Sequence, residues 1–281
     1  MHLIKNGGLL VVVLENVAGT MQNLSECPNF MRNVKLTLSR ECPEFSWSIT
    51  VANTEDYQVP HHRVRAYLRG LRRTVGALPP PLPAFGRKKL IDFLDLRLPN
   101  ARRCDLGNTR RKNLRRLELQ VACALASGKI LPGQLAVVAI DRAQGKVYKV
   151  TIFLDRAPTL TTRNWFLFVF SVEDLHKLDK DRRVFRWLAP SERLRLQGAP
   201  DSDASLLTAC AARHAAGNSF SAPTISAMLA PLLDALGRMP AGTLFAWPPP
   251  GLADGVVGSL ASNFVVDDGS PPDGRRVRMR V

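Results

Sequence analysis

Long apolar runs, paired cysteines and acidic residues are all scarce in this sequence. The longest apolar runs, at residues 9–14 and 165–169, are far shorter than the roughly 20 residues that a membrane-spanning helix needs. The five cysteines are scattered without a Cys-x-x-Cys pair, so neither a disulfide framework nor a metal site is expected. No small-residue cleavage site follows the first apolar run, which argues against a secretory signal. We therefore expect no membrane association and no secretion, with the protein in the nucleus of a eukaryotic cell or otherwise in the cytoplasm.

The shortage of acidic residues leaves a large positive charge. Lys and Arg number 39 against 24 Asp and Glu, giving a formal net charge of +15 at pH 7. A field of this sign attracts polyanions, which makes nucleic acid the leading candidate partner, although charge alone does not distinguish it from an anionic membrane surface. The basic residues concentrate between residues 87 and 116. Their clusters are Arg87-Lys88-Lys89, Arg102-Arg103, Arg110-Arg111-Lys112 and Arg115-Arg116.

The hydrophobic pattern predicts a mixed α/β protein. Residues 9–14 form a continuous β-branched and leucine run, typical of a strand buried on both faces of a parallel sheet. Two more strands are predicted at residues 46–51 and 65–68, and a helix over residues 22–39 gives a β-α-β pattern. Further along, the patterns predict strands at 135–140, 147–154 and 165–170, and helices at 190–197 and 221–236.

Four short motifs follow one another along the chain. They are Val13-Leu14-Glu15-Asn16-Val17, Val59-Pro60-His61-His62-Arg63-Val64-Arg65, the segment 190–201 (PSERLRLQGAPD), and Gly217-Asn218-Ser219-Phe220. In this order they resemble the Glu-Asn-Val, Pro-Gln-x-Arg-x-Arg, Arg-Glu-x-x-Arg-Leu-Gln-Gly-Phe-Pro and Gly-Asn-Ser motifs of DNA (cytosine-5) methyltransferases. Residues 157–163 also match a segment that usually lies upstream of the third motif. Each motif is common alone, but together they support a resemblance over residues 9–75 and 155–236.

The resemblance implies an incomplete Rossmann-like methyltransferase sheet with a smaller mixed target-recognition domain. Residues 1–75 would then be the carboxy-terminal part of the catalytic domain, and residues 76–204 the target-recognition domain with its basic insert. Residues 205–245 would return to the catalytic domain as a closing helix segment. Residues 246–281, rich in Gly, Pro and Asp, are expected to form a disordered tail.

The resemblance also assigns roles in catalysis. Enzymes of this family flip a cytosine out of the duplex, attack its carbon 6 with a cysteine thiolate and transfer methyl from S-adenosyl-L-methionine to carbon 5. Glu15 would be the acid at ring nitrogen 3. Arg63 and Arg65 would face one way from one strand and hold the carbonyl oxygen of the base and the DNA backbone. The alternatives are a surface glutamate that caps a helix and two solvated arginines.

Cofactor and DNA contacts follow from the same resemblance. Asn218 and Ser219 would contact S-adenosyl-L-methionine at the start of a helix, where backbone amides can bind a carboxylate; ordinary helix capping is the alternative. Thr161 would bind a DNA phosphate. Arg110, Arg111 and Arg115 would track the DNA backbone, unless they belong to a solvated loop. Glu192, Arg195 and Gln197 are expected to organise the small domain, and His61 stands where the family usually has Gln.

Two parts of the family's catalytic machinery do not occur in the sequence. A complete enzyme has a Phe-x-Gly-x-Gly cofactor loop and a Pro-Cys nucleophile loop before Glu-Asn-Val, whereas Cys27-Pro28 and Cys42-Pro43 have the reverse order and come later. We therefore expect a fragment or half of a split enzyme, with a complementary chain carrying the amino-terminal half. The alternatives are an inactive DNA-binding or regulatory module and a relative that methylates transfer RNA.

Overall fold

The computed structural model describes residue 4 and residues 8–21, 29–95, 108–139, 152–162, 167–172, 186–199 and 206–238. The chain divides into two compact units, Met1–Trp247 and Pro248–Val281, and all described residues belong to the first. The expected disordered tail, residues 246–281, and the Cys27-Pro28 dipeptide lie outside the described residues. Within the described part, no helix is both long enough and apolar enough to cross a membrane.

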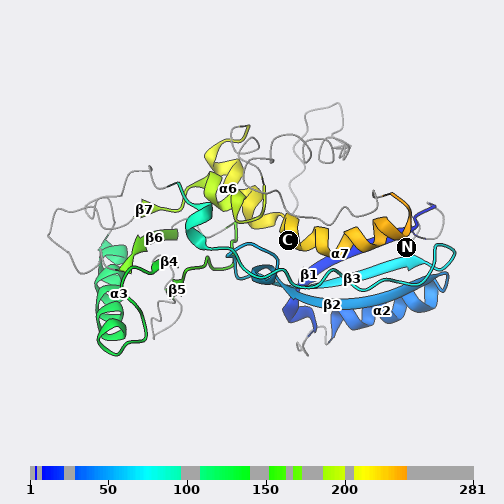
Figure 1. Ribbon diagram of the computed structural model, residues 1–281, viewed down its shortest axis with the longest axis horizontal. Helices are drawn as coiled ribbons and strands as arrows, with labels where there is room; N and C mark the ends of the chain where they lie inside the picture. Colours follow the sequence, from blue (N-terminus) through cyan, green and yellow to red (C-terminus); the bar gives the residue numbers. More distant parts are fainter. Residues whose placement is uncertain are drawn as a thin grey trace, which may run out of the picture. The chain divides into compact units, whose positions relative to one another are not determined.

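A three-stranded sheet contains the first motif and the end of the second (Figure 1). Its strands are β1 (Val11–Val17), β2 (Phe45–Asn53) and β3 (Val64–Arg72), in the order β1-β3-β2. β3 is central and antiparallel to both neighbours. Between β1 and β2 come η1 (Ala18–Met21) and α2 (Phe30–Glu41), and η2 (Thr54–Asp56) lies between β2 and β3. The mixed α/β class is confirmed. β1 and β2, which precede and follow α2 in the sequence, run in the same direction, as a β-α-β pattern predicts.

The prediction of a first strand buried in a parallel sheet is wrong. β1 pairs with β3 in antiparallel orientation, and within the described sheet it is an edge strand. Only Val12 of this strand is buried, whereas Leu14 and Val17 are 42% and 49% exposed. The short connection between β2 and β3 explains the difference, because it returns β3 antiparallel to β2 and places it between the two parallel strands.

Each face of this sheet packs against a helix. Alternate residues of a strand face opposite sides, so β3 contributes to two separate cores. On one side α2 packs with Met31 and Leu38 in a cluster that contains Val12, Phe45, Trp47, Ala66 and Leu68. On the other side α7 (Ala222–Ala235) contributes Ala227 and Met228 to a cluster with Ala52, Tyr57 and Tyr67.

A proline inside α7 fixes the segment that follows β3. Pro231 has no N–H, so it cannot donate to the carbonyl of Ala227 four residues earlier. That carbonyl instead accepts a hydrogen bond from the backbone N–H of Leu82 at 3.0 Å. Arg69, almost fully buried, donates from Nε to the carbonyl of Met228 and from Nη2 to the carbonyl of Pro79, both at 2.9 Å. The proline-rich stretch is therefore tied to α7.

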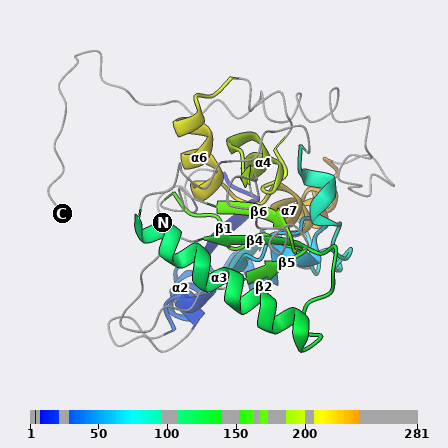
Figure 2. The same cartoon turned by 90° about the vertical axis from the view of Figure 1, so that its left-hand side faces the viewer.

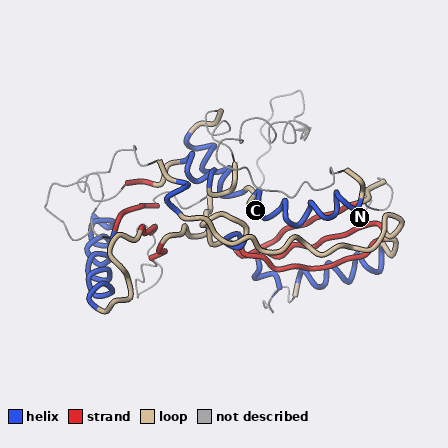
Figure 3. The backbone as a smooth tube through the Cα atoms, viewed as in Figure 1, coloured by secondary structure: helices blue, strands red, loops and turns tan. Residues whose placement is uncertain are grey.

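A second, four-stranded sheet follows in the chain. Its strands are β4 (Leu135–Ala139), β5 (Ile152–Leu154), β6 (Leu167–Ser171) and β7 (Arg186–Trp187), in the order β5-β4-β6-β7, and all pairs are antiparallel. These strands and those of the first sheet are drawn in red in Figure 3. Figure 2 shows α3 (Asn108–Ala126) running across this sheet, where Leu117 and Val121 pack against Ala136, Val138 and Phe170.

Three short elements complete the part that positions the site. They are η3 (Leu90–Phe93), α4 (Pro190–Arg195) and α6 (Ala209–Asn218). The predicted helices at 190–197 and 221–236 are confirmed as α4 and α7, and Gly237 follows α7 with a φ of +63°, as a glycine after a helix often does. The predicted strands at 135–140 and 165–170 are confirmed as β4 and β6. Of the predicted strand at 147–154, only residues 152–154 lie in the described part.

Candidate active site

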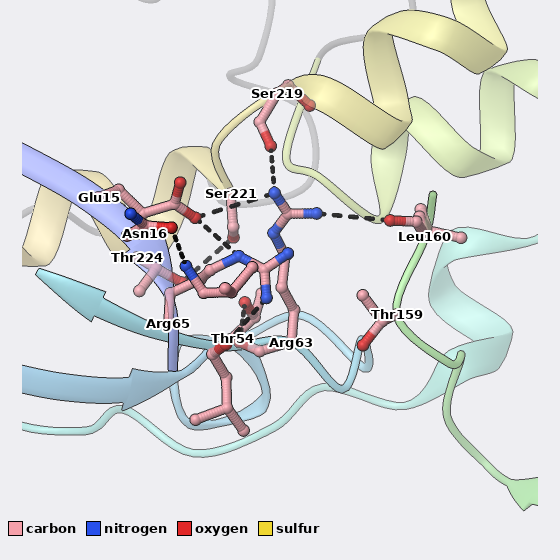
Figure 4. Close-up of polar contacts among 12 residues, drawn as sticks. Glu15, Asn16, Thr54, Arg63, Arg65, Thr159, Leu160, Ser219, Ser221 and Thr224 are labelled. Atoms are coloured by element: carbon pink, nitrogen blue, oxygen red, sulfur yellow. Dashed lines mark hydrogen bonds and ion pairs between the residues drawn. The ribbon is translucent and has the colours of Figure 1, made fainter. Parts of the chain in front are cut away.

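Glu15 and Arg65 meet on the face of the first sheet that α7 covers. Glu15 lies opposite Tyr67 across the β1–β3 pair, and Val17 lies opposite Arg65. Residues two apart on a strand share a face, so the carboxylate of Glu15 and the guanidinium of Arg65 point to the same side. Glu15 Oε1 lies 3.0 Å from Arg65 Nε, and each side chain is 12% exposed. Two of the three predicted catalytic residues are thus in direct contact (Figure 4).

Arg63 stands one residue before β3 and continues the same alternation. Its Nη2 lies 3.8 Å from the same oxygen of Glu15, donates to the carbonyl of Ser219 at 3.0 Å, and its Nη1 donates to the carbonyl of Leu160 at 3.4 Å. Its backbone is also held, because the carbonyl of Arg63 accepts from both the N–H and the hydroxyl of Thr54. In Figure 4 the guanidinium of Arg63 lies at the centre of these partners.

Burial and charge together perturb the titration of two groups in this site. Burial lowers the pKa of Arg63, and the neighbouring charge of Arg65 lowers it further, while Glu15 opposes the change. Burial also raises the pKa of Tyr67, and the charge of Glu15 adds to the increase. Tyr67 therefore remains a neutral phenol beneath the charged pair at any ordinary pH.

His61 is a buried neutral histidine next to the arginines. Complete burial, followed by the charges of Arg63 and Arg65, lowers the pKa of His61 to about 3. Its Nε2 accepts a hydrogen bond from the backbone N–H of Leu160 at 3.0 Å. His61 also forms a parallel bridge with Ala157. The residue at the position where the family usually has Gln thus joins the segment 157–162 to the arginine motif.

The last turn of α6 lies directly against the segment 157–162. A Cβ atom added to Gly217 would overlap the backbone nitrogen of Thr162, so only glycine permits this approach. Gln197 reinforces the joint, because its side-chain amide donates to the carbonyl of Ala216 at 2.8 Å. The backbone carbonyl of Gln197 accepts from the N–H of Ala222 at the start of α7 at 2.7 Å. Three motif segments therefore converge beside Arg63.

The expectation that Asn218 and Ser219 begin a helix is wrong. Asn218 is the last residue of α6 and Ser219 its C-cap, whereas α7 begins at Ala222 after Ser221. Asn218 is exposed, and Ser219 is partly buried, with a buried hydroxyl that has no hydrogen-bond partner among the described residues.

The residues predicted to bind DNA fall into two groups. Thr161 belongs to the segment that contacts Arg63 and Gly217, and its buried Oγ1 has no hydrogen-bond partner within the described structure. Arg110, Arg111 and Arg115 belong to α3, which packs on the second sheet. Arg115 is exposed, and the side chains of the other two lie outside the described part. Thr161 therefore follows directly after Leu160, which contacts Arg63, whereas Arg115 lies on α3.

Glu192 holds together the segments around α4 and β7. Its carboxylate, which is fully buried, receives two hydrogen bonds from Arg186, at 2.8 and 2.6 Å. It also accepts from the backbone N–H groups of Asp95 and Ala189. Arg195 donates to the carbonyl of Phe93 at 3.4 Å. These contacts are internal to the chain.

Sequence reasoning missed Tyr67 and Gly217 as parts of the site. Tyr67 continues the alternation of Arg63 and Arg65, so its place on the same face was available from the strand pattern. The role of Gly217 depends on a contact with the backbone of Thr162, which no local pattern encodes. Among the described residues, no group of three or more His, Cys, Asp or Glu side chains could hold a metal ion.

Fold and site together define an α/β protein with an acid–arginine pair at a sheet edge. The model of the family of C-5 cytosine-specific DNA methylases matches residues 2–233, and the chain belongs to this family. The Entamoeba histolytica methyltransferase EhMeth is a similar solved structure, with a TM-score of 0.48, 16% identity and coverage of 84% of this chain and 68% of that one. S. pombe Dnmt2 methyltransferase has a TM-score of 0.49 and 14% identity over 80% of this chain and 67% of that one. No curated protein sequence matches this chain.

Proposed function

We propose that this chain takes part in methyl transfer from S-adenosyl-L-methionine to carbon 5 of a flipped cytosine in DNA. The observation that carries the proposal is the contact between Glu15 and Arg65, at 3.0 Å on one sheet face. Membership of the cytosine methylase family supports the reaction class, and the net charge of +15 supports a polyanionic substrate.

Glu15 and Arg65 have complementary roles in this proposal. Glu15 is the acid for ring nitrogen 3 when a thiolate adds to carbon 6. Because its carboxylate is ion-paired with Arg65 in the free chain, it must take up a proton from solvent as the base binds. Arg65 holds the carbonyl oxygen of the base, a task that suits a permanently charged guanidinium with several donors. Glu15 Oε1 is buried and ion-paired, yet it makes no hydrogen bond of regular geometry among the described residues. It therefore keeps the capacity to exchange a hydrogen bond with the base.

Asn218 and Ser219 fit a cofactor contact in part. The buried hydroxyl of Ser219, without a hydrogen-bond partner among the described residues, and the exposed amide of Asn218 are suitable groups for a polar ligand. S-adenosyl-L-methionine, when bound, supplies the methyl group. The 281 residues contain neither a Phe-x-Gly-x-Gly run nor a Pro-Cys dipeptide. We propose that polypeptide outside these residues supplies both, either as part of a longer chain or as a complementary one.

The outer edge of β1 fits such a complementary polypeptide. β1 is the edge of the described sheet, and the unpaired backbone groups of an edge strand can bind another strand. Exposed apolar side chains run along it, including Leu10, Leu14 and Val17 at 41%, 42% and 49% exposure. Glu15 lies in the same strand. A strand added at this edge would therefore bring its own residues next to the proposed acid.

Complementation tests the proposal. The chain is co-expressed with the amino-terminal half of a cytosine methyltransferase that carries the cofactor loop and the Pro-Cys nucleophile. Co-purification of the two halves and transfer of labelled methyl to duplex DNA are then measured, with transfer RNA as a parallel substrate. We expect methylated DNA from the wild type and a loss of about 100-fold or more in Glu15→Gln, since a general acid contributes roughly 10²–10⁴-fold. Glu41→Gln, a change on the surface of α2, serves as the matched control. Normal methylation by Glu15→Gln would remove this residue from the mechanism.

A second candidate is a DNA-binding or regulatory module without catalysis. The observation that favours it is the combination of a basic chain with no Pro-Cys dipeptide in its 281 residues. Binding of duplex DNA by the chain alone, weakening as salt rises, together with no methyl transfer in any complementation, would select this candidate. Absence of duplex binding even at low salt would exclude it.

A further inference from the structure

The two arginines of the second motif are used differently by the fold. Arg63 is 4% exposed, and its guanidinium donates to the backbone carbonyls of Leu160 and Ser219, which lie 97 and 156 residues further along the chain. The guanidinium of Arg65 is paired with Glu15 and donates a hydrogen bond to the carbonyl of its own neighbour, Val64. Arg63 therefore joins segments that are far apart in the sequence, whereas the contacts of Arg65 are to Val64 in β3 and to Glu15 in the adjacent strand β1.

Releasing Arg63 from these partners would be costly. Hydrogen bonds from a charged donor are stronger than neutral ones. A buried carbonyl that is left without its donor lowers the stability of the folded protein. Both terminal nitrogens of Arg63 already donate to carbonyls of the chain, and its Nε is buried without a hydrogen-bond partner among the described residues. A phosphate would therefore have to enter a buried position and compete with these carbonyls, because Arg63 is only 4% exposed.

The segments that Arg63 joins also meet each other directly. The N–H of Leu160 donates to His61, and Gly217 packs against the backbone of Thr162. Arg63 lies between these contacts, with Nη2 3.8 Å from Glu15. One side chain thus links the proposed acid to the segment 157–162 and to the end of α6.

We propose that Arg63 is a positioning residue that clamps the segment 157–162 and the end of α6 against Glu15, and that Arg65 is the arginine that meets the substrate. The part about substrate rests on the proposed function. The clamp itself rests only on the contacts within the chain. Arg63 is then not a ligand of the DNA backbone, in contrast to the role that the family resemblance suggests for it.

Hydrogen exchange on the chain alone tests the clamp without any substrate. In Arg63→Gln and Arg63→Lys we expect the backbone amides of residues 157–162 and 215–221 to lose protection together, because the fork that joins them is gone. A lysine offers a single point charge and cannot reproduce two diverging donors. Arg65→Lys serves as the matched control and should leave both segments protected. Unchanged protection in Arg63→Gln would overturn the clamp.

Salt-dependent duplex binding separates a clamp from a phosphate ligand. Removal of one phosphate contact lowers the slope of log K against log salt by about 1. We expect Arg63→Gln to keep the wild-type slope. A decrease of about 1 would make Arg63 a DNA ligand and overturn the proposal.

Steady-state kinetics of the complemented enzyme provide the functional arm. We expect Arg63→Lys to lower kcat by about 100-fold, the effect of misplacing a catalytic group by roughly 1 Å, with KM for duplex nearly unchanged. Gly217→Ala, which disturbs the same joint without removing charge, should give the same split and keeps the test valid if Arg63→Gln does not fold. Wild-type kcat in both variants would overturn the proposal. No methyl transfer by the complemented wild type would instead refute the proposed function and leave the exchange result to decide the clamp.

Discussion

Replacing His61 with Gln should make the protein less sensitive to acid. The folded state holds the pKa of His61 at about 3, chiefly because the side chain is completely buried, whereas an unfolded chain leaves a histidine near 6.5. Below about pH 6.5 the unfolded state therefore binds a proton on His61, whereas the folded state leaves His61 neutral. The stability that depends on neutral His61 is fully present above pH 6.5 and is lost as the pH falls towards 3.

The size of this effect follows from the gap between the two pKa values. At pH 5 the pH lies about 1.5 units below the pKa of the unfolded histidine, which corresponds to about 2 kcal/mol of lost stability. A glutamine at position 61 has no proton to gain, and its side-chain oxygen can accept the N–H of Leu160 as Nε2 of His61 now does. The variant should therefore lose about 2 kcal/mol less than the wild type between pH 7.5 and pH 5.

Urea unfolding at the two pH values measures the effect, since a shift in midpoint at constant slope reports stability. Gln120→Asn is the matched control, because Gln120 is an exposed residue of α3 with no titrating group and the change should leave the pH dependence at its wild-type size. Other groups titrate over the same range, but they cancel when variants are compared. Equal losses in wild type and His61→Gln would refute the reasoning that burial keeps His61 neutral.

Two other substitutions test the packing that positions the site. Gly70→Ala should destabilise the protein by about 1–3 kcal/mol, because an added Cβ would overlap the ring of Trp47; the thermal midpoint measures it, and an unchanged midpoint would show that the ring moves freely. Glu192→Gln should cost about 3–5 kcal/mol in urea unfolding, because it leaves the buried guanidinium of Arg186 without its charge partner. A loss below 1 kcal/mol would mean that solvent replaces the carboxylate.

Strand periodicity predicts which residues of one strand share a face, but it does not predict that Glu15 and Arg65 meet. Both motifs were expected at strands, and alternation predicted that the side chains of Arg63 and Arg65 face one way. The register of β1 and β3, with Glu15 opposite Tyr67, was not available from either strand alone. This register depends on the position of β3 between β1 and β2. The connection from β2 to β3 sets that position, and the hydrophobic pattern does not encode its direction.

The helix α3 shows why the basic region was harder to interpret. Residues 108–126 were considered only as a charged segment, although Leu117, Val121 and Ala124 recur at helical spacing. The charge of the surrounding arginines concealed this pattern. In the structure Leu117 and Val121 form the core of the second sheet, while Leu119 on the outer face is 68% exposed. Counting apolar positions separately from charges would have found the helix.

The contacts of Arg63 could not have been predicted from side-chain types, because its partners are main-chain carbonyls. Every residue has a carbonyl, so Leu160 and Ser219 carry no sequence signal for this role. The same holds for Gly217, whose function is to have no Cβ where Thr162 passes. Several motif residues of this chain thus make contacts within the protein: Glu192 binds Arg186, Gln197 binds Ala216, and Arg63 binds two carbonyls. A motif match therefore indicates contacts that hold the fold together as well as residues that take part in chemistry. Glu15 and Arg65 form a charged pair and stay partly exposed, so they are the motif residues to which we assign the substrate chemistry.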